Sequence, residues 1–447
     1  MTSTVSQHRH DVLQDLVAQI LDEAKRQGAS QAEASVSEGK GLSVTVRLGE
    51  VETIEYHRDK GLGVTVYFGQ AKGHASTSDF SEQAIRETVR AAATIARHTA
   101  ADPFSGLADP ALLARDIPDL DLYHPWDIDS DAAVELAKRC EETARSADPR
   151  ICNSEGATLG TGEGLSVYAN SHGFLGAYQS SRHSLSCSVL AQDSHGNMQR
   201  DYWYDVSRKA GNLPSPESIG RIAAERTLRR LDARKLSTRK APVLFENQVA
   251  SSLLSHFASA ISGSNLYRRT SFLIDALGQR IFSPEIRIYE EPYRKMGLGS
   301  APFDGEGVAT HNRDLVSRGE LQGYLLDSYS ARKLGMTSTG NAGGAHNLTL
   351  EPGQQDLAAL LRTMNTGLFV TELIGFGVNN VTGDYSRGAA GFWVENGEIQ
   401  FPVEEITIAG NLKEMYGQIA AVGSDMLIHG NTGCPSILIE NMTIAGA

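Results

Sequence analysis

The sequence predicts an α+β protein of two domains, and three observations support this. The chain has 447 residues, more than one ordinary hydrophobic core accommodates. An order of strands and helices occurs twice in the first half, and glycine becomes frequent in the second half. We therefore expect an N-terminal domain over residues 1–236, with a duplicated strand-rich unit and helices on one face, and a glycine-rich, mainly antiparallel C-terminal β domain with helices over residues 237–447.

The duplicated unit begins after an amphipathic segment, residues 1–30, whose apolar residues recur at helical spacing. Alternating apolar and polar residues then predict about four short strands, followed by a helix with Ser81 as its N-cap. The same order returns later, and the tetrapeptide "GLSV" at Gly41 and Gly164 aligns the two copies. The predicted strand regions are 41–77 and 164–204, and the predicted helices that follow them are 81–98 and 215–231.

The rest of the chain is divided by turn-forming residues. Residues 101–130 are rich in proline and aspartate and predict a long loop within the first domain. Residues 231–247 join the end of a helix to the start of a strand and give the expected domain boundary. In the second half, Asn396-Gly397 between alternating apolar residues predicts a β-hairpin.

Composition excludes several classes of function. A formal net charge of −13 disfavours nucleic-acid binding, and the basic run at 226–240 is expected to be a solvated helix face and linker. No apolar run approaches the roughly 20 residues of a membrane span. Four cysteines without a C-x-x-C pair fit the reduced thiols of a cytoplasmic protein. The G-x-S-x-G, G-x-G-x-x-G and P-loop patterns are all missing.

One predicted helix carries a histidine and raises the question of a metal site. It contains "SSLLSHFASAISG" at 251–263, with Asn247 as the expected N-cap and Gly263 just after its end. His256 borders the apolar stripe, which predicts a partly buried histidine with one hydrogen bond. A catalytic zinc takes three protein ligands and a water, and neither Ser251 nor Ser252 can replace a histidine or glutamate.

Four stretches carry a resemblance to a known family. They are "NSHGFLGAYQSSRHSLSCSV", "GSNLYRRTSFLIDALG", "SYSARKLGMTSTGNAGGAHN" and "GDYSRGAAGFWVENGEIQFPVEEITIAGNLKEM". The chain resembles the TldD/PmbA family nearly end to end, and within it the PmbA type, also called TldE. This resemblance implies a subunit that pairs with a TldD-type subunit, whose helix carries the zinc motif H-E-x-x-x-H completed by a cysteine near the C-terminus. The implied activity is proteolysis of unfolded or extended peptides, including maturation of peptide-antibiotic precursors and degradation of an antitoxin.

The resemblance also implies that the zinc motif is degenerate here. If His256 matches the last histidine, the first histidine and the glutamate fall on Ser251 and Ser252. Cys434 near the C-terminus is the other weak metal candidate, but two ligands without a general base do not make a catalytic site. We therefore expect no metal in this chain and zinc in the TldD-type partner.

Two further features leave alternatives open. Asp384 and Arg387 in "TGDYSRG" are candidates for substrate binding, against a simple ion pair in a loop. Ser251, Ser255, Ser259 and Ser262 form a stripe of small residues that favours close packing, either within the chain or against another subunit.

The predicted function is that of the PmbA-type subunit of a heteromeric zinc metalloprotease that degrades or matures extended peptides. A homodimer is a possible state of the chain alone, and neither nucleic acid nor membrane is expected as a partner. A peptide-binding or regulatory protein without a proteolytic partner is the first alternative. An active peptidase with an unrecognised site is the second.

Overall fold

The computed structural model describes residues 2–446, which fold into an α+β structure with three six-stranded sheets. The predicted fold class is confirmed. The first half of the chain forms one sheet, with strands β1 (Gln31–Arg47), β2 (Glu50–Phe68), β3 (Ala71–Thr77), β4 (Ile151–Asn170), β5 (Leu175–Gln192) and β6 (Met198–Ser207). Its helices are α1 (Thr2–Arg26), α2 (Glu82–His98), α3 (Ser130–Ser146) and α4 (Pro216–Leu228). The strand order is β3-β2-β1-β4-β5-β6.

The element order α-β-β-β-α occurs twice, as α1 to α2 and as α3 to α4. The prediction of four short strands in each copy was wrong, because each copy has three strands and the longest are 17 to 20 residues. Glycines that suggested turns lie inside these long strands, where Gly39 pairs with Gly164 and Gly41 with Gly162. Glycine at these positions lets the strands bend without ending.

The register relates the two copies by an approximate two-fold axis. Lys40 on β1 lies opposite Glu163 on β4, and the two side chains form an ion pair of 2.9 Å. Lys40 and Glu163 are separated by the same number of residues in the sequence as Gly41 and Gly164, where the two "GLSV" stretches begin. The axis therefore passes through the Lys40–Glu163 pair, at the middle of the sheet.

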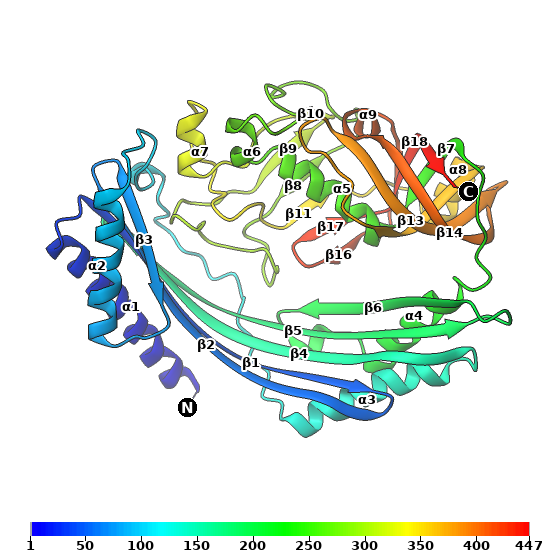
Figure 1. Cartoon of the computed structure of the whole chain (residues 1–447), viewed down its shortest axis with the longest axis horizontal. Helices are drawn as coiled ribbons and strands as arrows, with labels where there is room; N and C mark the ends of the chain where they lie inside the picture. The colour runs from blue at the N-terminus through cyan, green and yellow to red at the C-terminus, as the bar shows by residue number, and fades with distance from the viewer. Residues whose placement is uncertain (1, 447) are drawn as a thin grey trace.

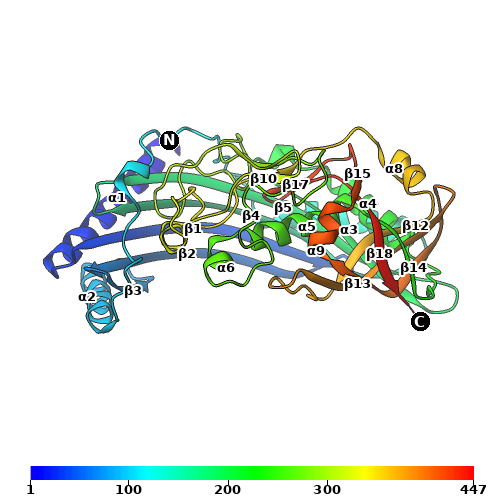
Figure 2. The same cartoon turned by 90° about the horizontal axis from the view of Figure 1, so that it is seen from above.

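All four helices cover one face of this sheet. One core cluster packs α1 and α2 against β1, β2 and β4, with Val17, Val64 and Val89 in its centre. A second cluster packs α3 and α4 against the other half, with Val44, Ala137 and Ile219. Figure 1 shows the curved sheet with the second half of the chain on its concave side, and Figure 2 shows those later elements lying across the same strands.

The concave face is lined by small polar residues and glycine, because these alternate with the apolar residues that contact the helices. Thr45 and Thr158 mark this face, with their hydroxyl oxygens 3.0 Å apart. The residues of this face on β1, β4 and β5 include Ser35, Ser37, Gly39, Gly41, Ser43, Thr45, Thr158, Gly160, Gly162, Gly164, Ser166, Ser180, Ser184 and Ser186.

The second half forms two further sheets. Its strands are β7 (Arg239–Phe245), β8 (Ile288–Glu290), β9 (Arg313–Ser317), β10 (Glu320–Leu321), β11 (Leu348–Leu350), β12 (Gly367–Ile374), β13 (Asp384–Glu395), β14 (Glu398–Asn411), β15 (Ile419–Val422), β16 (Leu427–His429), β17 (Thr432–Cys434) and β18 (Ile437–Ala445). Its helices are α5 (Asn247–Ala260), α6 (Gly263–Tyr267), α7 (Ser328–Lys333), α8 (Leu357–Met364) and α9 (Leu412–Gly417).

The orders of these sheets are β10-β9-β8-β11-β17-β16 and β14-β13-β12-β7-β18-β15. β14 also pairs with β18, which closes the second of these sheets. The predicted hairpin is confirmed: Asn396 and Gly397 join β13 to β14 with φ values of 53° and 77°, as a tight two-residue turn requires. Among the described residues, no helix is long and apolar enough to span a membrane.

Buried ion pairs join the two halves of the chain. Arg226 on α4 contacts Asp201 on β6 at 3.4 Å and Glu246 of the second half at 3.0 Å. Arg230 adds contacts to Asp201 and to Glu372 on β12. The prediction that the basic run is a solvated helix face was therefore wrong for these two arginines. Their partners are distant in sequence, and Arg226 is only 8% exposed.

Candidate functional site

Helix α5 is the site helix expected from the sequence, but its ends differ from the prediction. The N-cap is Glu246, and Asn247 is the first helical residue. The Asn247 side chain donates a hydrogen bond of 2.8 Å to the carbonyl oxygen of Asp425, so it is not available to cap the helix. Gly263 does not end α5 but begins α6, where a Cβ atom would lie 2.1 Å from Oγ of Ser330.

The serines of α5 use their hydroxyl groups within the helix itself. Ser251 donates to the carbonyl oxygen of Gln248 at 2.7 Å, and Ser252 donates to that of Val249 at the same distance. Ser255 and Ser259 are exposed. Close packing of the stripe within the chain is therefore wrong at these two positions, and the exposed part of the stripe faces outward.

His256 lies at the border of the buried face of α5, as expected. Its ring is half-buried, and its centroid is 6.1 Å from that of Tyr385 on β13, in an edge-to-face arrangement. The predicted hydrogen bond was wrong, because Nε2 of His256 is buried with no hydrogen-bond partner in the described part of the chain. Burial and the nearby charge of Arg387 both lower the pKa of His256, so the imidazole is neutral at neutral pH.

Asp384 and Arg387 do not form the ion pair considered above. Both lie on β13, but Asp384 is exposed while Arg387 shares the strand face of the buried Tyr385. The Asp384 carboxylate accepts hydrogen bonds from Thr382 at 2.6 Å and Asn411 at 3.2 Å, and these lower its pKa. The structure thus brings Arg387 to His256 and separates both from Asp384.

Tyr385 is the residue of this cluster that the sequence analysis missed. It is 1% exposed, and its hydroxyl group has no hydrogen-bond partner among the described residues. Burial raises the pKa of Tyr385, although the charge of Arg387 acts in the opposite direction. The alternation in "DYSR" was the available signal, since it places Tyr385 and Arg387 on one face of a strand.

Cys434 lies on β17 in the main core of the second half, fully buried. Its thiol donates to the carbonyl oxygen of Pro435 at 3.3 Å, and burial, with the nearby Asp425, raises its pKa well above the ordinary value.

Zinc does not fit the residues around His256. The residues one turn before His256 include Ser251 and Ser252, whose hydroxyls donate to carbonyl oxygens of their own helix. The guanidinium of Arg387 also repels a cation at this position. Over residues 2–446 there is no group of three or more His, Cys, Asp or Glu residues that could hold a metal ion.

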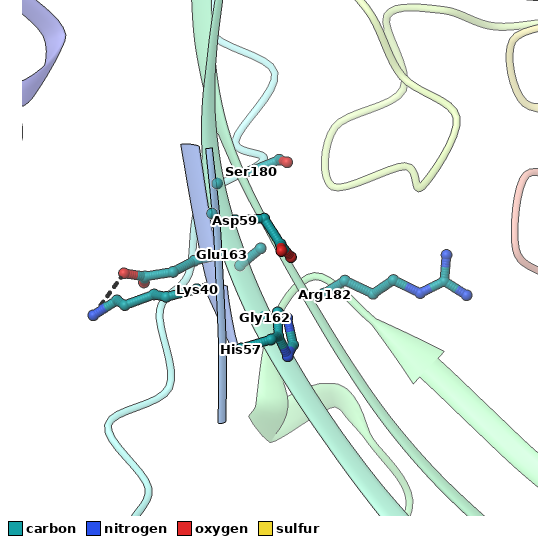
Figure 3. Close-up of a pocket in the computed structure, with 10 residues that line it drawn as sticks. Lys40, His57, Asp59, Gly162, Glu163, Ser180 and Arg182 are labelled. Atoms are coloured by element: carbon teal, nitrogen blue, oxygen red, sulfur yellow. Dashed lines mark ion pairs between the residues drawn. The ribbon is translucent and has the colours of Figure 1, made fainter. Parts of the chain in front are cut away.

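A second candidate site lies in the first domain, at the two-fold axis of the sheet. Figure 3 shows this pocket of about 240 Å³, with Asp59, Ser180 and Arg182 on one side of the strands and the Lys40–Glu163 pair on the other. Gly39, Gly162 and Gly164 line the pocket, and Gly41 beside it leaves room for the ring of His57, which a Cβ atom there would approach to 2.2 Å. Because Asp59 and Arg182 are exposed, the pocket is an open polar depression in the concave face.

Comparison with known proteins relates the whole chain to one group. Profiles of the PmbA/TldA metallopeptidase domain 1, central domain and C-terminal domain match residues 32–96, 123–231 and 238–446. The chain is 51% identical over 435 residues to Metalloprotease PmbA of Escherichia coli O157:H7, which covers 97% of this chain and 96% of that protein. It is 24% identical to a Metalloprotease TldD homolog of Buchnera aphidicola, over 88% of this chain and 87% of the relative.

A solved structure shares the complete fold. The crystal structure of a protein from Bacteroides thetaiotaomicron, described as a proposed modulator of DNA gyrase, superposes with a TM-score of 0.92 at 30% identity. The superposition covers 97% of this chain and 98% of that one.

Proposed function

The chain belongs to the TldD/PmbA metallopeptidase family, as a member of its PmbA type, and from this premise we propose that it is the non-catalytic subunit of a heteromeric zinc metalloprotease. The observation that carries the proposal is the chemistry around α5. If His256 matches the last histidine of the motif, Ser251 and Ser252 fall on a zinc ligand and the general base, and the charge of Arg387 acts on His256. We assign zinc and the hydrolytic step to a TldD-type partner.

Two features support a role in holding extended peptides. The concave face of the first sheet presents serine, threonine and glycine, which accept many side chains without steric conflict. β16 is an edge strand with Ile428 51% exposed, and a peptide can add to such an edge through backbone hydrogen bonds. The His429 ring at the end of β16 lies 4.4 Å from that of Tyr204 on β6, so this edge reaches the first domain.

The test is reconstitution with metal analysis of each subunit. We expect the isolated chain to contain well under one zinc per molecule and to leave an unfolded peptide intact. The mixture with a TldD-type subunit should cleave the peptide, and replacing the glutamate of the partner's H-E-x-x-x-H motif by glutamine should abolish cleavage. Stoichiometric zinc in the isolated chain, lost in His256→Ala, would show a catalytic site here.

The same experiment separates the alternative of a regulatory peptide-binding protein. Binding of extended peptides by the chain, with no complex and no cleavage in the presence of the TldD-type subunit, would support that alternative and refute the proposal. Cleavage by the TldD-type subunit alone, at the rate of the mixture, would also refute it.

A further inference from the structure

His256, Tyr385 and Arg387 come together from α5 and β13 with their hydrogen-bonding groups unused. Nε2 of His256, the hydroxyl of Tyr385 and Nε of Arg387 are all buried, and none has a partner within the described residues. Buried polar groups in folded proteins are nearly always hydrogen-bonded, because leaving one unpaired costs folding free energy. The His256 and Tyr385 rings lie 6.1 Å apart, and Arg387 shares the strand face of Tyr385, so three unpaired groups gather in one region.

The region carries a positive charge that no carboxylate of the described residues neutralises. Arg387 acts electrostatically on both His256 and Tyr385, yet no carboxylate of the described residues pairs with its guanidinium. Other half-buried arginines without a carboxylate, such as Arg208 and Arg332, donate to backbone carbonyl oxygens instead, and no such bond is found for Arg387 among the described residues. A partly buried guanidinium is stable when an anion neutralises it.

We propose that His256, Tyr385 and Arg387 form a binding site for a single carboxylate group of a peptide. A guanidinium offers two parallel N–H donors that match the two oxygens of a carboxylate. The tyrosine hydroxyl and the neutral imidazole each supply one further donor. Tyr385 is buried, whereas His256 and Arg387 are half-buried, so a ligand would reach the tyrosine hydroxyl only if these two side chains move aside.

The surroundings favour a peptide as the source of the carboxylate. The exposed Ser255 and Ser259 continue along α5 from His256 and leave the adjacent surface uncovered by this chain. On the other side, Val378 of the β12–β13 connection forms a bridge with Tyr385, which places a backbone segment beside the site. The carboxylate belongs to the C-terminus of the peptide or to an acidic side chain. That the ligand is a substrate rests on the proposed function, but the binding itself does not.

The experiment measures peptide binding to the full isolated chain by fluorescence anisotropy. Four labelled peptides of one extended, otherwise uncharged sequence are compared: a free C-terminal acid, the C-terminal amide, and the amide with one internal glutamate or glutamine. We expect one carboxylate form to bind about tenfold or more tightly than its amide counterpart, as a charge-assisted hydrogen-bond pair implies. The pair of peptides that shows the difference identifies the source of the carboxylate.

Variants assign the preference to the site. Arg387→Gln should remove the difference between acid and amide, and Tyr385→Phe should reduce it several-fold while the chain stays folded. The matched control is Arg362→Gln, an exposed arginine of α8 in the same domain, which should leave the preference intact. Equal binding of all four peptides, or no detectable binding at millimolar concentration, would overturn the inference. So would an equal effect of Arg387→Gln and Arg362→Gln.

A further outcome distinguishes a ligand site from a hydrated structural cluster. If buried water satisfies these groups, Tyr385→Phe should lower the melting temperature and leave peptide binding unchanged, which also overturns the inference. Because no partner subunit is present, the result is independent of proteolysis. A carboxylate preference in a chain that never supports cleavage would leave the site standing and refute only the proposed function.

Discussion

Replacing Arg226 by methionine tests whether the buried ion pairs hold the two halves of the chain together. The Arg226 side chain is 9% exposed, and those of its partners Asp201 and Glu246 are 5% and 11% exposed. Removing one member of a buried pair costs about 3–5 kcal/mol, because the remaining charges stay buried without compensation. Arg229 still contacts Glu246 at 2.9 Å and Arg230 contacts Asp201 at 3.6 Å, so we expect a loss near 3 kcal/mol.

The assay is urea unfolding followed by tryptophan fluorescence, which suits this site because Trp203 lies 5.3 Å from the Arg226 guanidinium. The matched control is Arg139→Met, which removes a pair between α3 and α4 whose side chains are 52% and 41% exposed. It should cost at most about 1 kcal/mol. Equal losses for the two variants, or a gain in stability for Arg226→Met, would refute the argument.

Three further predictions concern single sites. Glu306→Gln should stabilise the fold by up to about 3 kcal/mol at about pH 8 and change its stability little near pH 4.5. The reason is that burial raises the Glu306 pKa from 4.5 to about 7, so the wild type loses stability as the pH rises across that interval. Unfolding measured at both pH values tests this. Ser251→Ala and Ser252→Ala should leave turnover of the reconstituted pair unchanged and shift the free energy of unfolding by about 0.5 kcal/mol or less. Both hydroxyls bond only to their own helix. A large fall in turnover would contradict this prediction. Ser259→Trp should leave unfolding of the isolated chain within about 0.5 kcal/mol, because Ser259 is exposed, and should weaken co-purification with a TldD-type subunit if α5 faces that subunit.

Features encoded by neighbouring residues could be predicted from the sequence. The hairpin at Asn396-Gly397 follows from two residues that accept positive φ, and Ser81 caps α2 by accepting a hydrogen bond from the backbone N–H of Ala84. The repeated order of elements was also visible. The number of strands in each repeat was not, because glycines inside a long bent strand have the same local signature as glycines in a turn.

Features that depend on distant residues could not be predicted. Asn247 appeared to be an N-cap until Asp425 was seen to accept its side-chain hydrogen bond. Arg226 and Arg230 were predicted to be solvated because Glu246 and Glu372 approach them only in the folded chain. For the candidate site, the sequence identified His256 and Arg387 separately. They come near each other because His256 on α5 and Tyr385 on β13 meet in the folded chain, and periodicity in either element does not contain that information.

The electrostatics around His256 disfavour a cation and favour an anion at this position. A zinc site concentrates neutral or anionic ligands around a divalent cation, whereas Arg387 places a fixed cation beside the remaining histidine. A carboxylate ligand removes this conflict, because it neutralises the guanidinium and accepts from the imidazole and the tyrosine hydroxyl. If the proposed match between α5 and the zinc helix of a TldD-type subunit holds, the same helix position would take a cation in that subunit and an anionic group of a peptide in this chain.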